Sequence, residues 1–304
     1  MNVLVTGGTG FIGSHVCDAL LLRGHLVRVL SRKPEPYRPP LAGVEYFLGD
    51  IADTFYLSEA LSGMDAVIHL VSSTVPGTSN LDPVADINFN LAGTVRMLEL
   101  MRQAGPKRIV FLSSGGTVYG EPSRLPVTED EPLNPLCSYG VTKVAIEHYL
   151  GMYAFLYDIE PVVLRASNPF GPRQGRLGIQ GLVAAFLSRM LAGKPLAVWG
   201  DGEVIRDYFY VSDLAELCAL AVEAKETGVF NAGSGQGTSI NRMIELIGSA
   251  TAMKPEVHYE PQRKFDVRET YLDISKARKA FGWKPSVDLE SGISRHWEWL
   301  RSLN

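Results

Sequence analysis

The chain has 304 residues, of which 46% are hydrophobic and 20% charged, and its formal net charge is −4. This composition is typical of a globular protein with a substantial core and excludes a disordered or fibrous one. Its 29 basic and 33 acidic residues supply no basic surplus for nucleic acid. Three widely spaced cysteines favour a reducing cytoplasm over a disulfide framework, the six histidines show no metal-ligand spacing, and no long apolar run predicts a membrane span.

Short apolar runs alternate with helical patterns through the first half of the chain. Strands are expected at 3–5, 27–30, 44–48, 66–70, 108–112 and 161–164. Helices are expected at 15–23, 90–104 and 138–157. Because strands that alternate with helices form right-handed βαβ units, the pattern predicts an α/β fold with a doubly wound parallel sheet of the Rossmann type.

The pattern changes after the sixth expected strand. Residues 168–181 hold two prolines and four glycines, which is too irregular for a crossover helix, whereas 229–231 again read as a buried strand. We therefore expect a dinucleotide-binding domain over 1–166, to which 204–230 return. A smaller, interleaved C-terminal substrate domain would comprise 167–203 and 231–304.

The segment TGGTGFIG follows the first expected strand and opens the first helix. Gly7 permits a sharp turn, Gly10 leaves room for a pyrophosphate, and Gly13 lets the helix pack closely on the sheet. The helix N-terminus at Phe11 and Ile12 would offer N–H groups and a positive dipole end to the anion. A plain glycine-rich turn is the alternative, but the strand–turn–helix context favours dinucleotide binding.

The ends of the next two strands should contact the adenosine half of the cofactor. A carboxylate at the second strand would accept bonds from a free ribose hydroxyl, whereas an arginine would accommodate a 2′-phosphate. Ser31, Arg32 and Lys33 supply no carboxylate, which marginally favours NADP; alternatively they form a solvated loop and NAD is held by other contacts. Asp50 and Ile51 follow the third strand and are placed to meet adenine, although Asp50 could equally cap the next helix.

Tyr139 and Lys143 are four residues apart in an expected helix and therefore share one face. An ammonium beside a phenol favours the phenolate and lowers its pKa from about 10 toward working pH. This makes Tyr139 a plausible proton acceptor for an alcohol. His69, at a strand end, is expected to be a structural hydrogen-bonding residue.

Together these motifs resemble extended short-chain dehydrogenases/reductases of the NAD-dependent epimerase/dehydratase family, most closely the UDP-glucose 4-epimerase group. The resemblance also rests on the segments GDI at 49–51, SSGGTVYG at 113–120, NPFGPR at 168–173, RDY at 206–208 and DISKARKAFGWKP at 273–285. It implies a nucleotide-sugar 4-epimerase, an isomerase acting on a UDP-hexose or UDP-N-acetylhexosamine through a 4-keto intermediate. Tyr139 would be the catalytic base and acid, and Lys143 would bind the nicotinamide ribose.

The resemblance implies further contacts and an assembly. Additional cofactor contacts would come from Leu70, Asn90 and Ser113. The nucleotide sugar would be bound by Asn168, Trp199, Arg206, Arg263 and Thr270. Two arginines suit a diphosphate, because the guanidinium fork matches phosphate oxygens. A homodimer would form through the helices at 90–104 and 138–157.

Three positions depart from the family pattern. Gly115 stands where the family has a serine or threonine that shares a hydrogen bond with the reacting sugar oxygen; we hypothesise that Thr117, or failing that Ser114, substitutes. Neither Gly116 nor Thr117 is acidic, which disfavours the dehydratase and decarboxylase chemistries. Thr270 stands where epimerases restricted to glucose and galactose carry a bulky tyrosine, which suggests room for an N-acetyl group.

Two other functions remain open on the sequence. An NADP-dependent reductase of 4-keto sugars is the main alternative, supported by Ser31 and Arg32. A non-catalytic dinucleotide-binding regulator is the other, but it would have no need for Tyr139 and Lys143 on one helical face.

Overall fold

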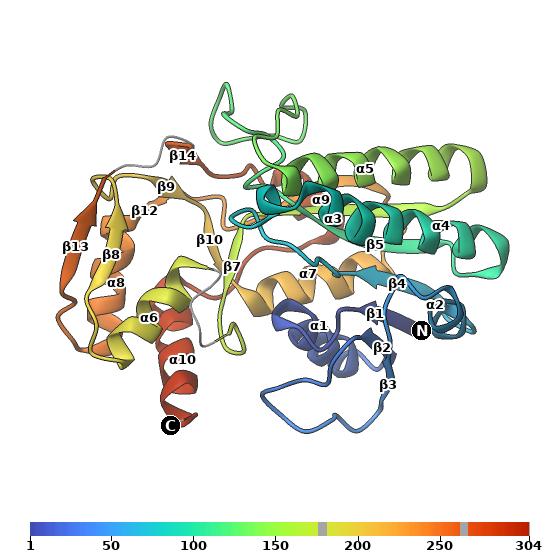
Figure 1. The fold of residues 1–304 in the computed structure, drawn as a ribbon, viewed down its shortest axis with the longest axis horizontal. Helices are drawn as coiled ribbons and strands as arrows, with labels where there is room; N and C mark the ends of the chain where they lie inside the picture. Colours follow the sequence, from blue (N-terminus) through green and yellow to red (C-terminus); the bar gives the residue numbers. More distant parts are fainter. Residues whose placement is uncertain (176–180, 262–266, 304) are drawn as a thin grey trace.

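The structure, a computed structural model, describes residues 1–175, 181–261 and 267–303. It has a larger lobe built on a parallel sheet and a smaller lobe beside it (Figure 1). The sheet has seven strands in the order β11-β6-β5-β4-β1-β2-β3. Its strands are β1 (Asn2–Thr6), β2 (Leu26–Ser31), β3 (Val44–Leu48), β4 (Ala66–His69), β5 (Arg108–Ser114), β6 (Glu160–Ala166) and β11 (Gly228–Ala232). All pair in parallel, which confirms the predicted doubly wound, Rossmann-type fold.

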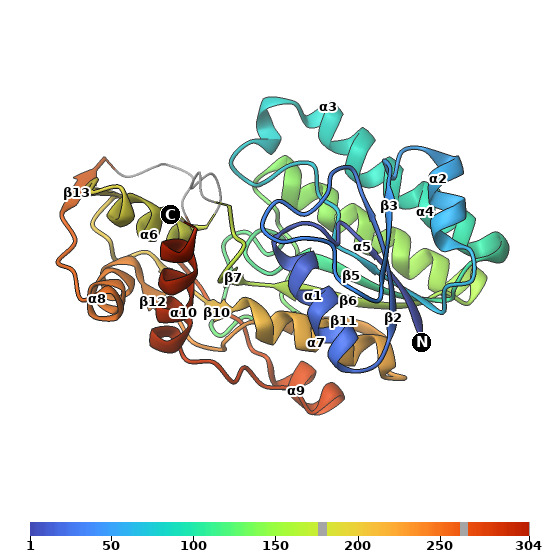
Figure 2. The same cartoon turned by 90° about the horizontal axis from the view of Figure 1, so that it is seen from below.

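Helices cover both faces of this sheet, as its apolar strands require. On one face α1 (Phe11–Leu22) and α7 (Val211–Glu223) pack into one core. On the other, α2 (Thr54–Leu61), α4 (Gly93–Ala104) and α5 (Ser138–Tyr157) pack into a second core. Figure 2 views the molecule from the side of α1 and α7. The helix expected from residue 90 begins earlier, with α3 (Pro83–Asp86) and a π-helical turn (Ile87–Ala92) continuing into α4.

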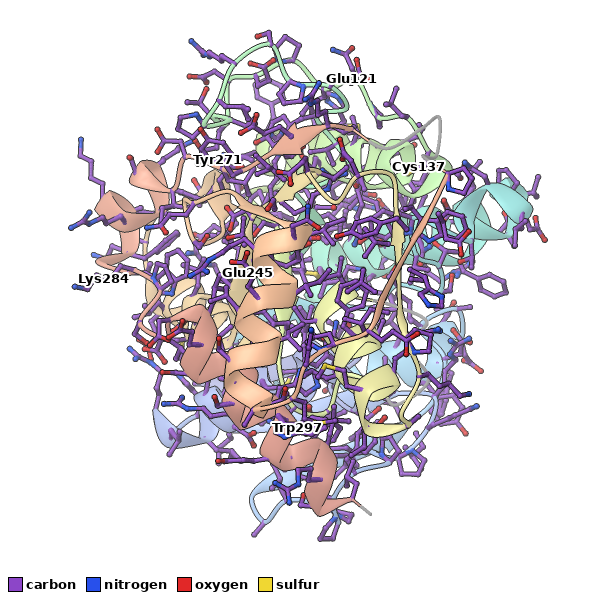
Figure 3. The ribbon with its side chains drawn as sticks, turned by 90° about the vertical axis from the view of Figure 1, so that its left-hand side faces the viewer. Glu121, Cys137, Glu245, Tyr271, Lys284 and Trp297 are labelled. Carbon is purple, nitrogen blue, oxygen red and sulfur yellow. The ribbon has the colours of Figure 1, made fainter. Side chains whose placement is uncertain are left out.

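The smaller lobe has its own core between short sheets and three helices. Its helices are α6 (Leu182–Leu191), α8 (Ile240–Thr251) and α10 (Leu289–Ser302). The strands form three small sheets: β8 (Leu196–Trp199) with β13 (Val257–Glu260); β9 (Ile205–Arg206) with β12 (Thr238–Ser239) and β14 (Glu269–Thr270); and β7 (Asn168–Phe170) with β10 (Tyr208–Tyr210). Figure 3 faces this lobe, with Glu245 on α8 and Trp297 on α10.

The chain returns to the large sheet twice after entering the smaller lobe. The expected strand at 229–231 is β11, paired with β6 at the sheet edge. Helix α9 (Ser275–Phe281) then packs beside β11, and Phe281 and Trp283 join the core under α1 and α7. These elements agree with the predicted interleaved topology, although the smaller domain predicted over 231–304 includes α9, which packs on the large sheet. The domain boundaries themselves stay a prediction.

None of the helices in the described ranges combines the length and apolar character needed to cross a bilayer. The same residues contain no group of three or more histidine, cysteine or carboxylate side chains that could hold a metal ion.

Candidate functional site

The glycine turn lies at the carboxyl edge of the sheet, directly after β1. Gly7 has a φ of 78°, which glycine adopts without strain. A Cβ on Gly13 would lie 2.2 Å from the carbonyl oxygen of Gly7, so the close helix–turn contact requires glycine. Gly10 is the N-cap of α1 without a side-chain cap, and the first turn at Phe11 and Ile12 has no acidic residue. The N–H groups of that turn lack intrahelical partners, and this arrangement fits a pyrophosphate.

The end of β2 is tied to the glycine turn. The Ser31 hydroxyl accepts a hydrogen bond from the Thr9 N–H at 3.3 Å, and the Thr9 hydroxyl donates to the carbonyl oxygen of Lys33 at 2.9 Å. Ser31 is buried and Arg32 is exposed. Ser31 therefore supports the turn itself, whereas Arg32 and Lys33 are exposed to solvent.

Residues after β3 and β4 lie along the same edge. The Asp50 carboxylate accepts a hydrogen bond from the backbone N–H two residues later, while Asp53 caps α2 by accepting two backbone N–H bonds. The N-cap of α2, one of the two roles considered for Asp50, is therefore Asp53. Ile51 is buried, and the Leu70 N–H donates to the carbonyl oxygen of Thr6 at 3.2 Å. Leu70 therefore lies beside the start of the glycine turn.

Tyr139 and Lys143 lie in the first turns of α5. Lys143 is only 4% exposed, and its Nζ donates to the carbonyl oxygen of Leu112 on β5 at 2.7 Å. The same Nζ lies 5.5 Å from the centre of the Tyr139 ring and 4.6 Å from that of Phe111. The structure therefore brings together the predicted phenol–ammonium pair.

The protonation of this pair is dominated by burial. Burial lowers the pKa of Lys143 to about 8, although the carboxylates of Glu147 and Asp86 act in the opposite direction. Burial, aided by Cys137 and Asp86, raises the pKa of Tyr139. This is opposite to the direction expected from the sequence, because desolvation of the phenol outweighs an ammonium that is bonded to Leu112 instead.

Asn90 lies on the π-helical turn, and its side chain is held by Ser73, Thr74 and Asp86. Its Oδ1 accepts a bond from the Ser73 N–H at 2.9 Å, and its Nδ2 donates to Asp86 at 2.6 Å. Ser73 belongs to the loop after β4. The amide orientation of Asn90 is therefore fixed by the walls of the site.

Ser113 is bonded to the next turn of α5, one turn after Lys143. Its hydroxyl donates to Glu147 at 2.5 Å, and Glu147 forms a buried ion pair with Arg165 at 2.7 Å. The Ser113 hydroxyl therefore belongs to a buried network beside the site, and its expected cofactor contact stays a prediction. Sequence reasoning missed Glu147 and Arg165. Glu147 could have been recognised as a carboxylate one helical turn after Lys143, and Arg165 as a charged residue inside an apolar strand.

The structure gives a physical reason for Gly115. A Cβ there would lie 2.5 Å from Leu272 Cδ1 and 2.9 Å from the carbonyl oxygen of Arg165. Leu272 thus occupies the space that a family serine would need. Nearby, the Thr117 hydroxyl oxygen is buried and has no hydrogen-bond partner in the described part of the chain. Ser114 is half-buried at the end of β5.

Residues expected to bind the nucleotide sugar lie in the smaller lobe. Thr270 on β14 pairs directly with Arg206 on β9. The Asn168 side-chain amide donates to the carbonyl oxygen of Asp207 at 3.0 Å, which places Asn168 beside Arg206. Trp199 is 40% exposed at the end of β8. Arg263 lies outside the described residues.

Asp207 organises this region and was missed by sequence reasoning. Its buried carboxylate accepts hydrogen bonds from the backbone and hydroxyl of Ser234 at 2.7 Å, and from the N–H groups of Gly235 at 3.3 Å and Leu272 at 3.2 Å. Burial raises the pKa of Asp207 even though these bonds oppose the shift. One carboxylate thus joins the segments that carry Arg206 and Thr270.

His69 is a structural hydrogen-bonding residue, as expected. Its ring nitrogens contact the hydroxyls of Thr6 at 2.7 Å and Thr94 at 2.9 Å, and Thr94 donates to the carbonyl oxygen of Asn90. Burial lowers the pKa of His69 to about 3, with Lys143 contributing. The ring is therefore neutral and links β1 to the π-helical turn.

Known proteins match this chain along its length. The model of the NAD dependent epimerase/dehydratase family matches residues 3–233. A putative UDP-glucose 4-epimerase of Methanocaldococcus jannaschii is 38% identical, with 99% of each chain covered. The crystal structure of a Thermotoga maritima UDP-glucose 4-epimerase with UDP-glucose has a TM-score of 0.95 at 37% identity, covering 100% of this chain and 99% of its own. A Thermus thermophilus UDP-glucose 4-epimerase in complex with NAD has a TM-score of 0.92 at 37% identity, covering 99% of both.

These matches cover the glycine turn, the Tyr139–Lys143 pair and the smaller lobe together. On this evidence the chain belongs to the NAD dependent epimerase/dehydratase family.

Proposed function

We propose that this protein is a nucleotide-sugar 4-epimerase that acts on a UDP-hexose or UDP-N-acetylhexosamine through a 4-keto intermediate. The observation that carries the proposal is the position of Tyr139 and Lys143 on one face of α5, with the Lys143 Nζ 5.5 Å from the centre of the Tyr139 ring and bonded to Leu112 at the carboxyl edge of the sheet. The glycine turn reaches that same edge after β1. The relatives described above are a putative UDP-glucose 4-epimerase and two UDP-glucose 4-epimerases, and the matches extend over essentially the whole length of each chain.

In this mechanism the protein's own groups handle the proton. When bound, the oxidised nicotinamide supplies hydride chemistry at sugar C4. Tyr139 takes the proton of the 4-hydroxyl and later returns it. Lys143 orients the nicotinamide ribose, and its charge favours the phenolate once both groups are enclosed with the cofactor. The unpartnered Thr117 hydroxyl donates to the reacting oxygen in place of the residue missing at Gly115.

The cofactor is proposed to be NAD, held by the glycine turn and by Arg32, Asp50, Ile51, Leu70 and Asn90. The marginal preference for NADP drawn from Ser31 and Arg32 finds no support in the relatives, because the Thermus thermophilus structure carries NAD. Ser31 is also engaged with the Thr9 N–H. Comparing the cofactor released from purified protein with NAD and NADP standards tests this choice.

The nucleotide sugar is proposed to lie between the lobes, with its diphosphate at Arg206 and Arg263. Asn168 and Trp199 complete this contact set, and Thr270 borders the sugar. Thr270 is 5% exposed and pairs with Arg206. In this proposal, the size of its side chain sets the space for the sugar. A threonine leaves room for an N-acetyl group that a tyrosine would fill.

Turnover of UDP-glucose and UDP-N-acetylglucosamine tests the function directly. Purified protein should convert at least one of them to its 4-epimer without added reductant. Tyr139→Phe should abolish conversion, while Tyr157→Phe, at the far end of the same helix, should not. Conversion that requires stoichiometric NADPH would instead support the reductase, and unchanged turnover in Tyr139→Phe would overturn the proposed role of the phenol.

We further propose a homodimer through the helices predicted at 90–104 and 138–157, which correspond to α4 with the π-helical turn before it and to α5. Apolar side chains on these elements are exposed: Ile87 at 46%, Phe89 at 46%, Val141 at 54%, Met152 at 42% and Phe155 at 88%. A second copy of this chain would bury them by pairing the helices. Phe155→Glu should shift the protein toward the monomer by light scattering, whereas a wild-type monomer would refute the dimer.

A further inference from the structure

Asp86, the last residue of α3, has a carboxylate that is completely enclosed. The residue is 0% exposed. Its Oδ1 accepts hydrogen bonds from the Thr74 hydroxyl at 2.5 Å and the Asn90 amide at 2.6 Å. Its Oδ2 accepts from the hydroxyls of Ser138 at 2.8 Å and Thr142 at 2.9 Å. All four donors are neutral, so the charge is solvated by the protein, and no cation among the described residues bonds to it directly.

These four donors come from the segments that surround the catalytic pair. Ser138 and Thr142 stand one residue before Tyr139 and Lys143, respectively, on the first turns of α5. Thr74 lies in the loop after β4, which Asn90 also holds through Ser73. A single carboxylate therefore sets the position of α5 relative to that loop and to the π-helical turn.

The charge of Asp86 acts on the same pair. Although burial opposes it, the hydrogen bonds hold the pKa of Asp86 below its usual value, so the group is ionised at neutral pH. Its negative charge raises the pKa of both Lys143 and Tyr139. Two other groups act on this pair: Glu147, which is paired with Arg165, raises the pKa of Lys143, and Cys137 raises that of Tyr139. The ring of His69 is neutral, and its own pKa is lowered in part by Lys143.

We propose that Asp86 is a positioning residue for the epimerase reaction, which fixes the first turns of α5 against the loop after β4 and sets the charge balance around Tyr139 and Lys143. This inference rests on the proposed function. It assigns two separable contributions, geometry and charge, to one side chain that does not touch the reacting atoms.

Asp86→Asn removes the charge while keeping the hydrogen bonds. The remaining oxygen can accept from Thr74 and Asn90, and the new amide can donate to Ser138 and Thr142, because hydroxyls also accept. With the negative charge gone, both limbs of the pH profile of kcat/KM should move to lower pH, by about one unit. Asp86→Glu keeps the charge but displaces the donors, so kcat should fall roughly tenfold with the limbs unmoved.

The matched control is Asp82→Asn, four residues before Asp86 at the N-terminus of α3. Asp82 is exposed and caps α3, and asparagine caps equally well. It makes the same change in net charge and should leave the profile in place. The assignment would be overturned if Asp86→Asn had the pH profile of the wild type, or if Asp82→Asn shifted the profile as much as Asp86→Asn. A purely structural role would change the stability of the protein but not its pH profile.

A second readout separates this proposal from the proposed function. The phenolate absorbance of the NAD-loaded Asp86→Asn variant is followed as a function of pH. Subtracting the absorbance of the double variant Asp86→Asn, Tyr139→Phe leaves the titration of Tyr139 alone. Its midpoint should lie at lower pH than the corresponding wild-type difference. If no UDP-sugar is epimerised but this midpoint moves, the proposed epimerase function is wrong and the charge contribution of Asp86 stands. If the midpoint does not move, the charge contribution of Asp86 is refuted, whatever the turnover.

Discussion

Replacing Gly115 with serine should destabilise the protein through a contact with one identified side chain. The new Cβ would lie 2.5 Å from Leu272 Cδ1 and 2.9 Å from the carbonyl oxygen of Arg165. Leu272 is fully buried against Val118, Tyr119 and Val127 and cannot turn away freely. Overpacking of this kind costs about 1–3 kcal/mol of unfolding free energy.

The contact predicts a coupling that can be measured. Leu272→Ala alone should cost about 2–5 kcal/mol, because a buried leucine leaves a cavity. In the double variant the serine enters that cavity, so the combined cost should fall short of the sum by about 1–2 kcal/mol. Relief is only partial because the Arg165 carbonyl belongs to the backbone of β6 and remains close.

Urea unfolding of the wild type, both single variants and the double variant, followed by tryptophan fluorescence, measures the coupling. Gly116→Ser is the control, since a Cβ at Gly116 would have no neighbour within 4 Å. It should change stability by less than about 0.5 kcal/mol. Additivity within about 0.5 kcal/mol, or a Gly115→Ser variant as stable as the wild type, would refute the packing explanation for Gly115.

Three further outcomes are expected. Thr117→Val should lower kcat by about 10²-fold while leaving NAD bound, because it removes a hydroxyl that donates to the reacting oxygen; unchanged turnover would exclude that role. Thr270→Tyr should reduce kcat/KM for UDP-N-acetylglucosamine at least tenfold more than for UDP-glucose, and equal losses would contradict a size limit at this position. Burial lowers the pKa of His15 from 6.5 to about 4, and of His69 and His296 from 6.5 to about 3. As the pH falls, the unfolded chain therefore binds protons at these histidines before the folded protein does. Between pH 6.5 and 4, the free energy of unfolding should fall by about 1.4 kcal/mol per pH unit for each histidine. Urea unfolding at a series of pH values measures this fall.

The features predictable from sequence were those encoded by neighbouring residues. Alternating apolar and helical patterns identified the strands of the large sheet, and the glycine spacing identified a turn whose contacts do require glycine at Gly13. Tyr139 and Lys143 were found because helical spacing alone places them on one face. The π-helical turn at 87–92 was missed, since its register depends on bonds that Asn90 makes to the loop after β4.

Features built from distant segments could not be derived in this way. Asp207 gains its role only when Ser234 and Leu272 are brought to it, and Asp86 only when α5 packs against α3. The direction of the Tyr139 pKa shift was likewise expected wrongly, because burial depends on the whole fold. Gly115 was recognised as a departure from the family, but its cause is Leu272, well over a hundred residues further along the chain.

The order in which the sheet is completed has a consequence during synthesis. The last strand of the sheet, β11, pairs with β6, and residues 167–227 separate the two. At ordinary translation rates the outer edge of β6 stays unpaired for about 3–12 s after it leaves the ribosome. Unpaired strand edges invite pairing with other chains. The nascent protein is therefore most open to aggregation, and most dependent on chaperones, in the interval before residue 232 emerges.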